Sequence, residues 1–191
     1  MQYRACITFC IISVLSFSTT TANAGSPWPF VPDDFTVPAT LEKSNYRLRM
    51  LTVDDVVKDY DAVMSSETHI QEVGPPGMTW PTDLTFEEDL IDLGWHQKEF
   101  INRTSFAYTV VTLDESRVIG CIYINPTRKE GADAAVFLWT RPPEQLDFLD
   151  EGKLRADVRV WLKEEWPFNN PVFPGTDISW DNWSALPEHP R

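Results

Sequence analysis

The chain has 191 residues, of which 42% are hydrophobic and 24% charged, with 29 Asp and Glu against 16 Lys and Arg. This length indicates one domain, and the composition excludes wholesale disorder, a collagen-like repeat and a disulfide-dense miniprotein. The formal net charge of −13 argues against binding to nucleic acid or to an anionic membrane surface, because both attract Lys and Arg.

The segment 1–24 has the layout of a secretory signal peptide. Arg4 supplies a positive start, residues 5–17 are mainly apolar, and Ala22-Asn23-Ala24 is an A-x-A cleavage site. As a helix the apolar run rises only about 20 Å, which is short of the roughly 30 Å hydrocarbon core of a bilayer. We therefore expect cleavage before Gly25, a secreted or periplasmic location and no membrane anchor in the mature chain, with an uncleaved anchor as the alternative.

The first half of the mature chain predicts an arm, a strand and a helix. Segment 25–44 is rich in proline and aromatic residues, which indicates an extended N-terminal arm. Residues 46–51 alternate in hydrophobicity, as in a β-strand. Thr52 and Asp55 have the pattern of a helix capping box, and apolar residues then recur at helical spacing over 53–64.

A loop and a second helix follow. Residues 65–84 contain three prolines and two glycines, which predicts a long irregular loop. Thr85 and Glu88 form a second capping box and open a helix predicted to run over 86–102. His96 in this helix is a candidate base, although a lone histidine on a helix is more often a surface residue.

The pattern changes from helical to alternating spacing near Ser105 and back near Asp150. The predicted elements are strands over 105–113, 118–125 and 134–140, a helix over 150–165, a short last strand at 171–174 or 178–180, and an irregular tail over 176–191. This order predicts an α+β chain whose three central strands are antiparallel neighbours.

Cysteine and histidine placement limits the chemistry. Signal cleavage would remove Cys6 and Cys10, and Cys121 alone can form no internal disulfide. Cys121 lies in the apolar strand segment 118–124, where a cysteine is expected to be a small buried hydrophobe. The three histidines share no spacing typical of zinc ligands, so the sequence predicts no metal site.

The order of elements resembles the GNAT superfamily of N-acetyltransferases, which has a strand, two helices, three antiparallel strands and a helix that carries acyl-CoA. The segments that carry the resemblance are Tyr46–Thr52 with Asp54-Asp55, Phe106–Val110 and Val118–Ile124. The resemblance covers the predicted domain, 45–175, and implies a mixed, mainly antiparallel sheet flanked by helices. It also implies transfer of an acyl group from acetyl-CoA or another acyl-CoA to a small-molecule or peptide amine, if the protein is active.

The resemblance also implies roles for particular residues. Trp139 and Thr140 match the place where the family's strand backbone pairs with the pantetheine arm of the cofactor. Tyr123 is a candidate acid for the leaving thiolate, and His69 opens the loop that lines the acceptor side. Trp139 as a core residue and Tyr123 as a half-buried aromatic residue remain alternatives.

The cofactor loop departs from the family pattern. Arg141, Gly152 and Lys153 are the candidate cofactor-binding residues where family members have a glycine-rich run whose N–H groups bind pyrophosphate. Residues 141–153 here contain one glycine, two prolines and four acids. Proline removes N–H donors and carboxylates repel phosphate, so we expect weak acetyl-CoA binding, at or beyond about 1 mM. A non-enzymatic exported binding domain on the same scaffold is the alternative function.

Overall fold

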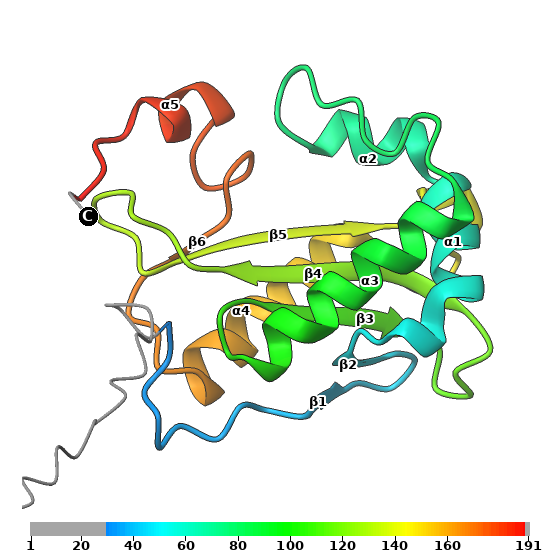
Figure 1. The fold of residues 1–191 in the computed structure, drawn as a ribbon, viewed down its shortest axis with the longest axis horizontal. Helices are drawn as coiled ribbons and strands as arrows, with labels where there is room; N and C mark the ends of the chain where they lie inside the picture. Colours follow the sequence, from blue (N-terminus) through cyan, green and yellow to red (C-terminus); the bar gives the residue numbers. More distant parts are fainter. Residues whose placement is uncertain (1–29, 190–191) are drawn as a thin grey trace, which may run out of the picture.

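The computed structural model describes residues 30–189; the expected signal peptide and the first residues of the arm lie outside this range. A six-stranded sheet runs in the order β1-β2-β3-β4-β5-β6 (Figure 1). The strands are β1 (Thr40–Glu42), β2 (Arg47–Met50), β3 (Phe106–Val111), β4 (Val118–Asn125), β5 (Ala134–Thr140) and β6 (Pro171–Val172). Neighbouring strands are antiparallel from β1 to β5, and β6 runs parallel to β5. The α+β, mainly antiparallel fold class is therefore confirmed.

Five α-helices and two short 3-10 turns connect and cover the sheet. They are η1 (Val53–Asp55), α1 (Val56–Met64), α2 (Glu67–Val73), α3 (Phe86–Ile101), η2 (Pro143–Gln145), α4 (Glu151–Glu165) and α5 (Trp180–Ala185). The capping box predicted for α3 is present: Thr85 accepts a hydrogen bond from the Glu88 N–H, and Glu88 accepts one from the Thr85 N–H. No helix within residues 30–189 combines the length and the apolar composition needed to cross a bilayer.

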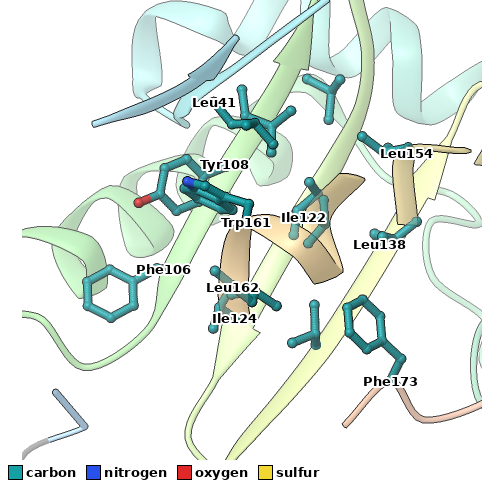
Figure 2. Close-up of a cluster of buried hydrophobic side chains, with 14 of the residues drawn as sticks. Leu41, Phe106, Tyr108, Ile122, Ile124, Leu138, Leu154, Trp161, Leu162 and Phe173 are labelled. Carbon is teal, nitrogen blue, oxygen red and sulfur yellow. The ribbon is translucent and has the colours of Figure 1, made fainter. Parts of the chain in front are cut away.

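The sheet separates two hydrophobic cores. Helices α1 and α3 lie over one face, and α4 covers the other (Figure 1). Because side chains alternate along a strand, Ile122 and Ile124 of β4 point toward α4, where they meet Trp161 (Figure 2). Cys121 of the same strand belongs to the core under α1 and α3.

Besides the short turn η2, the structure contains three elements where the sequence predicted none. Strand β1 lies within the predicted extended arm, α2 within the predicted loop and α5 within the predicted irregular tail. Only Ile70 of α2 is fully buried, so its residues show no helical hydrophobic spacing. Helix α5 begins after Ser179, whose side chain accepts a hydrogen bond from the Asn182 N–H. The last strand occupies the first of the two predicted positions.

Candidate functional site

The sheet opens between β5 and β6. These strands pair only at Ala134–Pro171 and Ala135–Val172. Beyond Ala135, no strand in the described part of the chain pairs with the outer edge of β5. Its other edge stays paired with β4 from Asn125 to Gly120. The outer edge of β5 therefore offers backbone N–H and C=O groups to a ligand.

A cleft of about 270 Å³ lies at this opening. Its walls come from α2, β5, α4 and the segment that follows β6, and they include Phe137, Phe173 and Trp180. Among its lining residues, all within 30–189, Glu72 is the only carboxylate and Arg155 the only cation. The cleft thus places aromatic side chains beside one potential base and one potential anion partner.

The α5 segment closes one side of the cleft. Gly175 has φ +82°, and a Cβ added there would stand 2.6 Å from Nε1 of Trp180. A side chain at position 175 would push the indole away, so glycine is required for this close approach. The Trp180 ring lies 6.4 Å from that of Phe137 on β5, across the cleft.

A carboxylate stands at the first residue of α4, between His69 and Arg155. Oε2 of Glu151 lies 3.0 Å from Nε2 of His69, and its Oε1 lies 2.6 Å from Nη2 of Arg155. His69 therefore acts on the cleft only indirectly, through the carboxylate that holds Arg155. Asp150 caps the same helix by accepting a 2.7 Å hydrogen bond from the Lys153 N–H. The protein's own acids thus occupy the positive end of the α4 dipole.

The candidate cofactor residues are engaged with the protein itself. Arg141 is 3% exposed, and its guanidinium donates 2.7 Å hydrogen bonds to the carbonyl of Val118 and to Oγ of Ser65, and pairs with Asp61. The Nζ of Lys153 lies 2.9 Å from Oδ2 of Asp157. Each of the three nitrogens of the Arg141 side chain thus donates to an acceptor of the protein itself.

Packing also constrains the other three candidates, Gly152, Trp139 and Thr140. A Cβ on Gly152 would stand 3.0 Å from Oδ1 of Asp150. Trp139 and Thr140, at the end of β5, are both buried, and Thr140 pairs with Gly120 of β4. A Cβ on Gly120 would lie 2.3 Å from the Trp139 carbonyl oxygen, so these two strands need glycine to approach this closely.

Tyr123 lies on the sheet face that α3 covers. Its ring stacks 6.2 Å from Phe137 and 5.1 Å from His96, so it meets the cleft only through Phe137. Burial lowers the pKa of His96, which favours the neutral imidazole. His96 is therefore half-buried on this face, with part of its side chain still exposed to solvent.

Two buried acids lie on the same face and had no signal in the sequence. Asp59 of α1 and Asp89 of α3 are 4% and 1% exposed. Within the described residues, Oδ1 of Asp59 and Oδ2 of Asp89 have no hydrogen-bond partner. Burial raises the pKa of Asp59 to about 8 and that of Asp89 to about 6. Asp59 therefore carries a proton at neutral pH. No group of three or more His, Cys, Asp or Glu within residues 30–189 is arranged to hold a metal ion.

No protein-family model matches the sequence, and no curated protein matches it. Solved structures match the fold. A ribosomal-protein-S5-alanine acetyltransferase from Vibrio fischeri is 19% identical over 65% of this chain and 67% of its own, with a TM-score of 0.51. The microcin C7 self-immunity acetyltransferase MccE, in complex with acetyl-CoA and AMP, is 10% identical over 67% of each chain, with a TM-score of 0.52.

A third match is the apo form of RimL, a ribosomal L7/L12 α-N-protein acetyltransferase. It is 13% identical over 72% of this chain and 69% of its own, with a TM-score of 0.53. Together with the order of the strands and the separation of β5 from β6, these matches establish that the chain has the fold of the GNAT acetyltransferases.

Proposed function

We propose that the protein transfers an acyl group from a thioester, the reactive end of acyl-CoA, to an amine in the cleft between β5 and the segment after β6. The observation that carries this proposal is the unpaired edge of β5 beside that cleft. An extended arm with amide groups, such as pantetheine, can pair with a free strand edge as an added strand does. One matched structure, that of MccE, contains acetyl-CoA.

The dimensions and charges of the site favour the thioester end of the donor over its nucleotide end. Ligand pockets usually measure roughly 300–1,000 Å³, and this cleft is slightly smaller. Arg141 donates its hydrogen bonds to protein acceptors, while Asp150 and Glu151 stand at the start of α4. A pyrophosphate placed there would meet carboxylates instead of free N–H groups, so the nucleotide contributes little to affinity.

Glu72 is the residue placed to act as the base. An amine attacks a thioester only in its neutral form, so a carboxylate at the rim of the cleft can take the proton of the ammonium form. The nitrogen then forms a bond to the acyl carbon, the carbon–sulfur bond breaks, and the sulfur leaves as a thiolate that takes up a proton. The candidate acid Tyr123 does not line the cleft, so the thiolate takes this proton from solvent, whereas Arg155 lines the cleft and can hold the acyl oxygen.

The first test compares two donors of different length. Titration calorimetry with acetyl-CoA and with S-acetyl-pantetheine should give dissociation constants within about threefold of each other, and that of acetyl-CoA should be near or above about 1 mM. If phosphate groups were held, acetyl-CoA would bind at least about tenfold more tightly, which corresponds to about 1.4 kcal/mol. A micromolar dissociation constant for acetyl-CoA, together with no detectable binding of S-acetyl-pantetheine, would show that the protein holds the nucleotide end of the donor. No binding of either thioester would reject the proposed function.

The second test addresses the base. Glu72→Gln keeps the size of the side chain and removes its basicity, so the rate of acyl transfer should fall by about 10²–10⁴ while thioester affinity stays unchanged. Glu67→Gln is the matched control, because Glu67 lies on the same helix but does not line the cleft. Full activity in the Glu72 variant, measured by release of free thiol, would remove this residue from the mechanism.

A further inference from the structure

Helix α3 carries an exposed apolar strip on the side turned away from the sheet. Ile91, Trp95 and Ile101 are 68%, 57% and 65% exposed. Figure 1 shows α3 lying over the sheet with its outer side uncovered. Single exposed apolar side chains are common, but a row of large ones along one helix marks an interaction surface.

The strip has the spacing of a helix–helix seam. Its central line runs through Glu87, Ile91, Gly94, Lys98 and Ile101, which recur at intervals of four and three residues, and Trp95 stands beside Ile91 at its edge. The line therefore mixes two isoleucines with a glycine and two charged residues. Residues spaced in this way lie along one side of a helix, as they do in coiled coils. The strip is therefore long enough to lie along a second helix over its whole length.

A hollow of about 320 Å³ opens in the C-terminal half of the strip. Four of its lining residues are Gly94, Gln97, Lys98 and Ile101, and Val53 stands beside them. Positions i, i+3, i+4 and i+7 are the four that surround the side chain of a neighbouring helix in knobs-into-holes packing. This shallow, wide-open depression therefore leaves room for one side chain of a neighbouring helix.

Gly94 is not required by the packing of the chain itself. A Cβ at this position would meet only Cγ1 of Val53, at 3.7 Å, which is an ordinary contact. Glycine inside a helix costs about 1 kcal/mol relative to alanine. The glycine therefore weakens the helix without relieving any internal clash, and its effect is to keep the outer surface hollow.

We propose that this strip pairs with the same strip of a second copy of the chain, with the two α3 helices antiparallel about a two-fold axis at Gly94. Ile91 precedes Gly94 by three residues, and Gln97 and Lys98, in the middle of the hollow, follow it by three and four. Rotation about the axis therefore places Ile91 of each copy in the hollow of the other. Such a contact is self-complementary, as a two-fold interface must be.

Charge on the strip selects this partner and this orientation. Glu87 lies at one end of the strip, and Lys98 lies beside the hollow, where it sits 4.8 Å over the ring of Trp95. In the antiparallel arrangement, Glu87 of one copy comes within a helical turn of Lys98 of the other, whereas a parallel arrangement would oppose like charges. A strip that carries its own complementary charges fits a second copy of itself.

The proposal is tested by sedimentation equilibrium. The protein is expressed from the full-length sequence and purified in the form that the cell produces. We expect twice the mass of one chain, and Ile91→Glu should raise the dimer dissociation constant at least 100-fold. Val160→Glu is the matched control, because Val160 is 50% exposed on α4, outside the strip, and this change should leave the mass unchanged. A monomer at about 100 μM, or a dimer that survives Ile91→Glu, would overturn the proposal.

Two further variants separate loss of the interface from loss of the fold. Glu87→Lys and Lys98→Glu should each weaken the dimer about tenfold, and the double variant should restore it. Gly94→Leu fills the hollow and should give a monomer that keeps the circular dichroism spectrum of the parent, because a Cβ there meets only Val53. A double charge swap that fails to restore the dimer would reject the antiparallel orientation.

Discussion

Replacing Arg141 with alanine is expected to lower the free energy of unfolding by about 2–4 kcal/mol. The buried guanidinium joins the start of β4, the end of α1 and the end of β5 through its bonds to Val118, Ser65 and Asp61. Truncation leaves the buried Val118 carbonyl without this donor and opens a cavity among the three elements. Urea denaturation followed by circular dichroism measures the change.

Lys153→Ala is the control for this substitution. The Lys153 side chain is 53% exposed and pairs with Asp157 on the surface of α4, so its removal should change stability by less than about 0.5 kcal/mol. If Arg141→Ala left stability unchanged and instead weakened acetyl-CoA binding, the guanidinium would serve the ligand rather than the fold.

The protein is expected to lose stability as the pH rises from about 5 to about 9. The pKa of Asp59 is raised to about 8 by burial, whereas an aspartate in an unfolded chain titrates near pH 4. A raised pKa means that the folded state binds the proton more tightly, so this contribution is complete below about pH 4 and is lost as the pH passes 8. Asp89, with its pKa raised to about 6, acts in the same direction at lower pH.

Asp59→Asn tests this pH dependence. The amide cannot ionise. The free energy of unfolding of the variant should therefore match that of the parent at pH 5 and exceed it at pH 9 by a few kcal/mol. Asp54→Asn, at an exposed position next to α1, is the control and should follow the parent at both pH values. Asp55 has the opposite effect, because the Arg49 guanidinium lowers its pKa in the folded state. Protonation of Asp55 in acid should therefore reduce the stability of the protein below about pH 4. Parallel pH curves for the parent and Asp59→Asn would show that Asp59 is ionised in the folded state.

Sequence patterns predicted the parts of the fold that local chemistry determines. The capping box at Thr85 and Glu88 predicts the start of α3 to the residue, and the apolar segments 118–125 and 134–140 coincide with β4 and β5. The 46–51 and 105–113 strands are confirmed with slightly shorter bounds, at Arg47–Met50 and Phe106–Val111. These elements can be read from the sequence because each carries its own cap or its own alternation.

The walls of the cleft could not be predicted in this way. Glu72 belongs to α2, where proline and glycine suggested an irregular loop, whereas Phe173 and Trp180 lie in the two segments that the sequence offered as alternative last strands. Ser179 before Trp180 was the one local signal for α5, and a single possible cap is too common to predict a helix. The cleft also depends on where β6 leaves β5, which is a long-range contact that no local pattern encodes. Burial of Arg141 was likewise hidden, because its partners Val118, Ser65 and Asp61 lie 23 to 80 residues away in the sequence.

The shortness of α2 and α5 has a consequence for how the cleft behaves. Helices of seven and six residues are too short to persist alone in water, so both walls exist only while they pack on the sheet. The free energy needed to widen the cleft is then the cost of locally melting one of these turns, which is much smaller than that of unfolding the sheet. Ligand binding and the order of these walls therefore depend on each other. A ligand that touches both walls uses part of its binding energy to order them, and the site thereby selects molecules large enough to reach both.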